Sequence, residues 1–430
     1  MLYYLCSITM SEIKPAKNSI RTADLHSSWF VTDNDLNPST NGADLNLHRF
    51  TVCEYIWLDG RGGLRSKTRV LLGIFEELDS LPIWNYDGSS TEQANSDGNT
   101  EVLLKPVFIC VDPLRPNINA ILVLCETSKG SDGCEATFET SKGSDGCEAT
   151  FETSKGSDGC EATFETFNGE GKPLPTNYRN IWSRNVQTFT CTTSRNAQTN
   201  MDLHEPWYGI EQEYTIFFTG AAGKGAITNA GGQHYCGTSI DIRERSIAEE
   251  HFMACLDAGL TVSGINAEVA TRQWEFQIGP VLGVAAADQT YVARFLLERI
   301  AEKYDAWICY HPKLAPDANG QGCHINFSTK QMREMGGIDV IMASIEKLRD
   351  KHKEHISIYG EHNHLRLTGQ HETSSMDTFS YGKGTRNTSI RIPNQTVKDS
   401  CGYFEDRRPA ANVELYGATW KIYETCCLEL

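Results

Sequence analysis

The chain has 430 residues, of which 40% are hydrophobic and 22% are charged, so it can bury a large core and form two or more domains. Its 56 acidic and 39 basic residues give a formal net charge of -17, which argues against a nucleic-acid partner because phosphate binding needs a basic face. The 15 cysteines include no Cys-x-x-Cys pair, which favours the reduced thiols of a cytoplasmic protein.

The first predicted segment is an N-terminal arm over residues 1–49. Its opening stretch, MLYYLCSIT, is apolar but lacks a cationic start and is too short to cross a bilayer. No later run approaches the roughly 18 apolar residues that a membrane span needs. We therefore expect no membrane partner.

Residues 50–127 are predicted to form a small β-rich domain. Short runs rich in β-branched and aromatic residues alternate with Gly, Pro, Asp and Asn turns. The predicted strands are VCEYIWL at 52–58, LRSKTRVL at 64–71, VLLKPVFICV at 102–111 and AILVLCE at 120–126.

Residues 128–166 repeat one 13-residue unit, SKGSDGCEATFET, three times without a substitution. Thirteen residues is well below the period of common solenoids, so we interpret the segment as a tandem duplication inside a linker. We predict a solvated surface loop, although each copy could instead form a SKGSDG turn and a short CEATFET strand. SRNVQT at 183 and SRNAQT at 194 suggest a second, smaller duplication.

Residues 167–430 are predicted to form a larger domain with mixed secondary structure. Apolar residues recur at helical spacing in 248–260, 288–307 and 337–356. Strands are expected between these helices at 209–218, 272–280, 322–328 and 388–393. The predicted fold class is therefore α+β, with a β-rich domain followed by a larger α+β domain.

Ionisable side chains occur inside several of these apolar strands. In YGIEQEYTIFF, two carboxylates at i and i+2 share one face, and they cannot both stay ionised there without a cation. If the strands adjoin, six ligands could hold two divalent ions, and a mainly oxygen donor set favours magnesium or manganese. The six are Glu211, Glu213, Glu268, Glu275, His324 and Glu405. Each glutamate taken alone could equally be a paired or solvated surface group.

Histidines and arginines cluster toward the C-terminus. The histidines at 352, 355, 362, 364 and 371 have no cysteine partner and lie mostly in a polar helix and loop, so we do not expect a zinc site. Guanidinium groups suit carboxylates and phosphoryl oxygens, and no phosphate-binding G-x-x-x-x-G-K-[ST] loop is present. Any nucleotide would then be held by metals and by arginines among Arg366, Arg386, Arg391, Arg407 and Arg408.

The ordered motifs WNYDGSST, PWYGIEQEY, NAEV, QWEFQIGP, NGQGCHINFS, RLTGQHETS, SIRIP and GYFEDRRP resemble those of eukaryotic-type glutamine synthetase (glutamate-ammonia ligase). The resemblance runs from about Phe50 to Asn412, apart from the insertions. It implies a β-grasp N-terminal domain and a larger catalytic domain with a curved antiparallel sheet flanked by helices. It also implies a homo-oligomer of two stacked pentameric rings, with each N-terminal domain packed on the neighbouring subunit's catalytic domain.

The resemblance implies a reaction in which ATP, L-glutamate and ammonium give L-glutamine, ADP and phosphate through a γ-glutamyl phosphate. Glu213, Glu268 and Glu275 match ligands of one metal, and Glu211, His324 and Glu405 match ligands of the second. Asp87 matches the group that takes a proton from ammonium, in a pocket framed by Ser90, Tyr235 and Glu372. Glu372 also matches a flap residue, and Arg386 a catalytic one.

The substrate contacts implied by the same resemblance fall into two groups. Asn319, Gly320, Arg366, Arg386 and Arg407 match residues that bind glutamate. The nucleotide side is matched by Trp207, Asn326, Ser328, Arg386, Arg391 and Tyr403. For Trp207, simple core packing is an equal alternative to stacking near adenine.

Some positions depart from the family pattern: Ala318, Leu365, Gln370 and the tail after Asn412. We expect these changes to reduce substrate affinity and to bear on ring assembly. Two other functions remain open: a γ-glutamyl ligase for another amine, and a non-catalytic family member with a structural or interaction role. The intact ammonium and metal residues favour glutamine synthesis.

Overall fold

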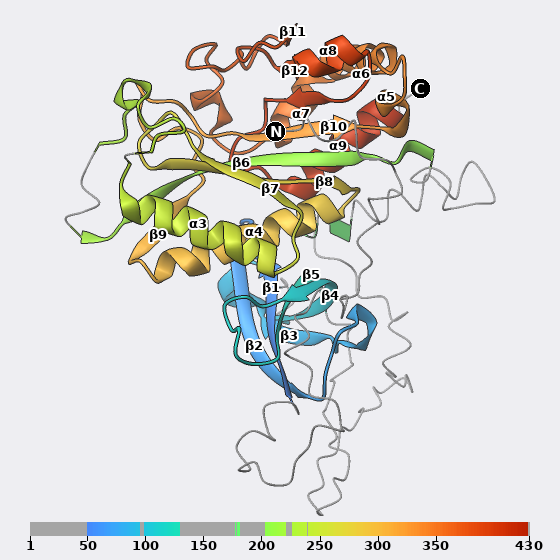
Figure 1. Ribbon diagram of the computed structural model, residues 1–430. Helices are drawn as coiled ribbons and strands as arrows, with labels where there is room; N and C mark the ends of the chain where they lie inside the picture. The colour runs from blue at the N-terminus through green and yellow to red at the C-terminus, as the bar shows by residue number, and fades with distance from the viewer. Residues whose placement is uncertain are drawn as a thin grey trace, which may run out of the picture. The chain divides into compact units, whose positions relative to one another are not determined.

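The computed structural model describes residues 50–94, 99–129, 177, 179–180, 203–220, 226–238 and 240–428 (Figure 1). The expected arm at 1–49 and residues 130–166 of the triplicated insert lie outside this range. The described residues form two compact units, one with residues 50–109 and 118–129 and the other with residues 110–117 and 203–428.

The smaller unit is built on a five-stranded mixed sheet in the order β2-β1-β5-β4-β3. β1 is antiparallel to β2 and parallel to β5, and such a parallel central pair agrees with the expected β-grasp domain. Aliphatic and aromatic residues fill its core, where the ring centroids of Trp57 and Tyr86 lie 4.5 Å apart. The strands are β1 (Phe50–Leu58), β2 (Leu64–Leu72), β3 (Trp84–Asp87), β4 (Glu101–Val111) and β5 (Ala120–Lys129), with short 3-10 turns η4 (Leu78–Ser80) and η5 (Gly88–Thr91).

The larger unit contains an eight-stranded sheet in the order β11-β12-β13-β10-β6-β8-β7, with β9 also paired to β6. Its pairs are antiparallel except for β11 with β12, so the α+β class is confirmed. The strands are β6 (Trp207–Phe218), β7 (Val262–Ala267), β8 (Gln273–Leu282), β9 (Ala306–Cys309), β10 (Cys323–Ser328), β11 (Tyr381–Lys383), β12 (Ile390–Ile392) and β13 (Phe404–Asp406).

Helices flank this sheet, and Figure 1 shows α3 and α4 running along one side of it. Asp241 caps α3 by accepting a hydrogen bond from the Arg243 N–H, and α4 is buried on most of its surface. The helices are α3 (Ile242–Asp257), α4 (Ala285–Glu302), α5 (Lys330–Arg333), α6 (Ile338–Asp350), α7 (His352–Ile358), α8 (Asn394–Asp399) and α9 (Leu415–Tyr423), with 3-10 turns η7 (Ala230–Gly232) and η8 (Asn363–Leu365).

Two expected helices differ in extent from the observed ones. The pattern over 288–307 predicts one helix, but α4 ends at Glu302 because residues 306–309 pair with β6 as β9. The pattern over 337–356 is divided at Lys351, which leaves helical geometry between α6 and α7.

The unusual C-terminal tail is helical. After α9, residues Glu424–Leu428 form a π-helical segment (η9), and Trp420 and Tyr423 pack with Cys427 and Leu428. Among the described residues, none of the helices combines the length and the apolar character that a bilayer crossing requires.

Candidate active site

The larger unit contains a cavity of about 790 Å³ lined by side chains from β6, β8, β10 and β13. All predicted site residues of this unit line it. They are Trp207, Glu211, Glu213, Tyr235, Glu268, Glu275, Asn319, Gly320, His324, Asn326, Ser328, Arg366, Glu372, Arg386, Arg391, Tyr403, Glu405 and Arg407.

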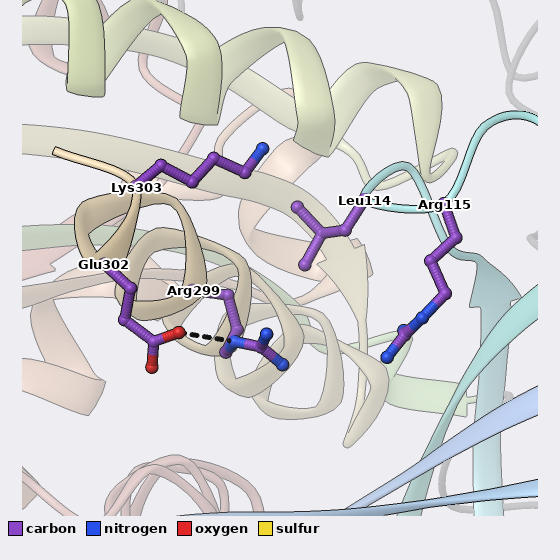
Figure 2. Close-up of a pocket in the computed structure, with 5 residues that line it drawn as sticks. All are labelled: Leu114, Arg115, Arg299, Glu302 and Lys303. Carbon is purple, nitrogen blue, oxygen red and sulfur yellow. Dashed lines mark hydrogen bonds and ion pairs between the residues drawn. The ribbon is translucent and has the colours of Figure 1, made fainter.

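A second hollow of about 320 Å³ contains none of the predicted residues (Figure 2). Its cationic side chains already have acidic partners: Arg299 Nε donates to Glu302 Oε2 at 2.9 Å, and Lys303 Nζ donates to Glu250 Oε1 at 2.7 Å. We therefore place the candidate active site in the larger cavity.

The register of the sheet explains how the acidic residues meet. Glu213 on β6 is paired directly with Glu275 on β8, and Glu211 is paired with His324 on β10. Glu405 on β13 lies opposite Asn326, two residues beyond His324. Since alternate residues of a strand share a face, these side chains all reach the same side of the sheet.

Glu213, Glu268 and Glu275 each offer an oxygen within 4.8 Å of the others. Burial, reinforced by neighbouring carboxylates, raises the pKa of Glu268 to about 8 and raises the pKa of Glu275 well above its usual value. Burial also raises the pKa of Glu213, against the opposing charge of Arg366. The three carboxylates therefore need additional positive charge in order to ionise together.

The second expected trio also converges. His324 Nδ1 lies 3.5 Å from Glu211 Oε2 and 3.6 Å from Glu405 Oε1, and this buried nitrogen has no hydrogen-bond partner. Burial, with the charge of Arg407, lowers the pKa of His324 well below its usual value, so the ring is neutral. Glu211, Glu275 and His324 likewise offer ligand atoms within 4.8 Å of one another, so Glu275 of the first trio also lies close to the second trio.

The donor set fits hard divalent ions. The first trio offers only carboxylate oxygens, and the second offers two carboxylates and one imidazole nitrogen, a donor set that suits Mg²⁺ or Mn²⁺ better than a thiolate-seeking metal. Arg366 Nη2 lies 3.0 Å from His324 Nε2, and a guanidinium can only donate. Nε2 therefore accepts this hydrogen bond, and the neutral ring carries its proton on Nδ1. Ligation of a metal through Nδ1 would require that proton to leave and, if it moved to Nε2, Arg366 to turn away.

Two predicted arginines hold Glu405. Arg407 Nη1 donates to Glu405 Oε1 at 2.6 Å, and Arg391 Nη1 donates to Glu405 Oε2 at 2.8 Å. The Glu405 side chain is only 1% exposed, so these are desolvated, strong ion pairs. Positive charge therefore lies on the cavity wall beside the acidic trios.

The expected flap and ammonium residues also lie together. Arg386 Nη1 is 3.9 Å from Glu372 Oε2, and a hydrogen bond with Tyr235 is the main influence raising the pKa of Arg386. His371 and Glu372 both have left-handed backbone conformations, with φ of 53° and 63°. Arg386 thus connects two of the predicted pocket residues.

The expected glutamate-binding turn is tightly fixed. Asn319 accepts a hydrogen bond from Asn229 Nδ2 at 3.1 Å, and its own N–H donates to Asn229 Oδ1 at 2.8 Å. A Cβ at Gly320 would lie 2.7 Å from Arg366 Cγ and from the Pro312 carbonyl oxygen, so a side chain there would displace Arg366. Ala318 and Leu365 do not line the cavity, and their expected effect on affinity stays a prediction.

Sequence reasoning missed Arg333 at the expected nucleotide end. Its guanidinium lies 4.1 Å from the centre of the Trp207 ring, and Arg333 Nη1 donates to Ser328 Oγ at 3.0 Å. Trp207 is therefore covered on one face by a cation rather than packed wholly in the core. The signal in the sequence was Thr329, which caps the short α5 and turns Arg333 back toward β10.

Sequence reasoning also missed the amides that orient the acidic trio. Gln273 Nε2 donates to Glu213 Oε2 at 3.0 Å, Gln277 Nε2 to Glu275 Oε1 at 2.6 Å, and Asn266 Nδ2 to Glu268 Oε1 at 2.8 Å. The period-2 spacing in QWEFQ, which places Gln273 and Gln277 on the face of Glu275, could have revealed two of them.

Asp87 and Ser90 belong to the smaller unit, in and after β3. Asp87 Oδ1 accepts hydrogen bonds from Ser89 N–H at 2.9 Å and Ser89 Oγ at 2.7 Å, which lower the pKa of Asp87. Both residues are exposed within their own unit. Their part in an ammonium pocket with Tyr235 and Glu372 stays a prediction.

Comparisons with known proteins agree on one family. A family described as "Glutamine synthetase, catalytic domain" matches residues 192–335. A "Putative glutamine synthetase" from Acanthamoeba polyphaga mimivirus is 44% identical over 387 residues, covering 88% of this chain and 94% of its own. A "Glutamine synthetase" from Eremothecium gossypii is 41% identical over 390 residues, covering 89% of this chain and 91% of its own. A "Glutamine synthetase" from Suillus bovinus is 41% identical over 385 residues, covering 87% of this chain and 93% of its own.

Proposed function

This chain belongs to the glutamine synthetase family, and we propose that it joins ammonia to L-glutamate at the expense of ATP, giving L-glutamine, ADP and phosphate. The observation that carries the proposal is the convergence of two acidic trios in one cavity beside Arg386, Arg391 and Arg407. The relatives reported above are named for this activity, and they give no support to a non-catalytic role or to another amine.

The acidic residues are proposed to hold two divalent ions. Glu213, Glu268 and Glu275 are the ligands of one, and Glu211, His324 and Glu405 are the ligands of the other. With Mg²⁺ or Mn²⁺ bound, the site gains positive charge that offsets the carboxylate and phosphoryl oxygens of the substrates. Gln273, Gln277 and Asn266 keep the carboxylates of the first trio in a fixed orientation.

Arginines and backbone bind the anionic substrates. Arg366 and Arg407 face the carboxylates of glutamate, and Asn319 and Gly320 hold its amino-acid end. Arg386 and Arg391 bind phosphoryl oxygens of ATP, while Trp207, Asn326, Ser328 and Tyr403 line the nucleotide end. The γ-carboxylate oxygen of glutamate attacks the γ-phosphorus of ATP, ADP leaves, and γ-glutamyl phosphate forms.

Ammonia then replaces phosphate. Asp87 accepts a proton from ammonium, and the released ammonia attacks the γ-carbonyl carbon, so that a C–N bond forms and the C–O bond to phosphate breaks. Glu372 takes the second proton from the new amide nitrogen. Ser90 and Tyr235 complete the ammonium pocket, and the flap that carries Glu372 keeps water away from the acyl phosphate.

The proposal extends to organisation and location. The domains are an arm at 1–49, a β-grasp domain at 50–127, a surface insert at 128–166 and a catalytic domain at 167–430. A homo-oligomer of stacked pentameric rings would bring Asp87 of one subunit to the catalytic domain of its neighbour. A cytoplasmic location is supported by the free thiols of the described cysteines, such as Cys53 and Cys323.

The activity is tested by following γ-glutamyl hydroxamate formation from ATP, Mg²⁺, glutamate and hydroxylamine, together with glutamine formation from ammonium. We expect both products from the parent protein and neither from Glu211→Gln. Glu302→Gln is the matched control, because that carboxylate is 64% exposed and lies outside the cavity. A parent protein that makes neither product, or a Glu211→Gln variant as active as Glu302→Gln, would overturn the proposal.

A further inference from the structure

Strand β13 and the two residues after it present alternating faces. Glu405 and Arg407 line the cavity, whereas Asp406 and Arg408 point into the protein interior and are fully buried. Arg408 Nε and Nη2 donate to the two oxygens of Asp406 at 2.9 and 2.7 Å. The catalytic face of this segment therefore has a buried ion pair directly behind it.

We propose that Asp406 and Arg408 are positioning residues for Glu405 and Arg407, held by a buried chain of hydrogen bonds that ends at Thr425 and at the Met376 carbonyl. This inference rests on the proposed function, because it assigns a supporting role to groups behind the same cavity. It gives the C-terminal π-helical segment a supporting role behind the cavity.

The first branch of the chain runs from Asp406 to the C-terminus. The Tyr359 hydroxyl donates to Asp406 Oδ2 at 2.8 Å, so its oxygen is free to accept from His355 Nδ1–H, 2.6 Å away. In that tautomer His355 Nε2 must accept, and the Thr425 hydroxyl donates to it at 3.0 Å. Burial lowers the pKa of His355 to about 3, which keeps the ring neutral as this arrangement requires.

The second branch runs toward the flap. Arg408 Nη1 can only donate, so His352 Nδ1 accepts at 3.1 Å, and His352 Nε2–H donates to the Met376 carbonyl at 2.9 Å. Met376 follows Glu372 by four residues in the chain. One guanidinium thus connects the strand that carries Glu405 with the segment that carries the expected flap residue.

Two side chains also fix the backbone of the same segment. Arg366 Nη2 donates to the Arg407 carbonyl at 3.0 Å, and Asn363 Nδ2 donates to the Arg408 carbonyl at 2.8 Å. A shift of Glu405 along or across the strand would therefore strain the buried hydrogen bonds that join Asp406 to Tyr359 and Arg408 to His352. Loss of the Thr425 hydroxyl therefore affects Asp406, because His355 and Tyr359 each accept a hydrogen bond from one neighbour and donate one to the next.

The test compares two threonines of the C-terminal segment. Thr425→Val removes the donor to His355, whereas Thr419→Val removes an equally buried hydroxyl that donates only to the helix carbonyls of Leu415 and Tyr416. Each purified full-length variant is titrated with Mn²⁺ by calorimetry and assayed for the glutamate KM, kcat and thermal midpoint. Thr425→Ser, which keeps the hydroxyl, is the rescue variant.

We expect Thr425→Val to weaken Mn²⁺ binding and raise the glutamate KM by about tenfold, with Thr425→Ser restoring both. Thr419→Val should lower the thermal midpoint without changing the Mn²⁺ affinity or the glutamate KM. If Thr425→Val does not fold, Tyr359→Phe is used in its place with the same expectation. Equal Mn²⁺ affinities in Thr425→Val and Thr419→Val would overturn the inference, and this comparison is valid even if the parent protein makes no glutamine.

Discussion

Two buried acidic clusters of the larger unit differ in how their charge is balanced. At Asp406, burial alone would raise the pKa, but the Arg408 guanidinium holds it below its usual value. At Glu268 and Glu275, burial and neighbouring carboxylates raise the pKa, and the surrounding residues supply too little positive charge to offset them. The balanced cluster needs no further charge, whereas the unbalanced cluster is where we propose that cations bind.

The largest effect is expected from removing one charge of the unbalanced cluster. Glu275→Gln keeps the shape of the side chain but removes a carboxylate that belongs to the first trio and lies close to the second. We expect kcat/KM to fall on the order of a thousandfold, because charge stabilisation in the transition state is lost. The metal-free variant should also have a higher thermal midpoint than the parent, since the cost of burying an ionisable carboxyl group among other carboxylates is gone.

Breaking the balanced cluster should act on stability. Arg408→Met leaves Asp406 as an uncompensated buried charge, so we expect the free energy of unfolding in urea to fall by about 3–5 kcal/mol. The double variant Asp406→Leu with Arg408→Met should recover much of that loss without recovering activity. If Arg408→Met is as stable as the parent, the ion pair between Asp406 and Arg408 does not stabilise the segment around β13.

The two clusters should also respond differently to pH. Glu268 has a folded-state pKa of about 8, above its unfolded value, so the folded state binds more protons between about pH 4.5 and 8. The metal-free protein should therefore lose about 2–4 kcal/mol of stability as pH rises through that window, as measured by urea titrations. Saturating Mg²⁺ should flatten the profile, and an unchanged slope would contradict the assignment.

A smaller effect is expected at the nucleotide end of the cavity, away from both clusters. Arg333→Ala removes the cation over Trp207 and the hydrogen bond to Ser328. We expect the KM for ATP to rise about fivefold with the glutamate KM unchanged. The KM for ATP of Arg333→Lys should lie between those of the parent and Arg333→Ala. An equal rise in the KM values for ATP and glutamate would place Arg333 outside the nucleotide site.

The sequence predicts the acidic strands well because their signal is local. A carboxylate within a short apolar strand stands out in EYTIFF, QWEFQIG and GYFED, and period-2 spacing assigns each side chain to a face. The strands expected around Glu211, Glu275 and His324 all form and lie side by side. The pattern also indicated that these residues could hold divalent ions, whereas their division between two metals came from the family resemblance.

Long-range partners could not be predicted in the same way. Glu405 meets Arg391, and His355 meets Thr425 across 70 residues of chain, only because the sheet register and the packing of α7 bring them together. Local patterns also fail where tertiary pairing competes, as when residues 306–309 leave the helical pattern to pair with β6. The histidines at 352 and 355, expected in a polar helix, are instead buried.

The most direct test of the account counts the cations that the acidic trios hold. Mn²⁺ is titrated into the metal-free full-length protein and into Glu268→Gln, with the number bound per chain followed by calorimetry. We predict two Mn²⁺ ions per parent chain and the loss of one in the variant. A parent chain that binds none, or a variant that binds the same number with the same affinity, would contradict the account.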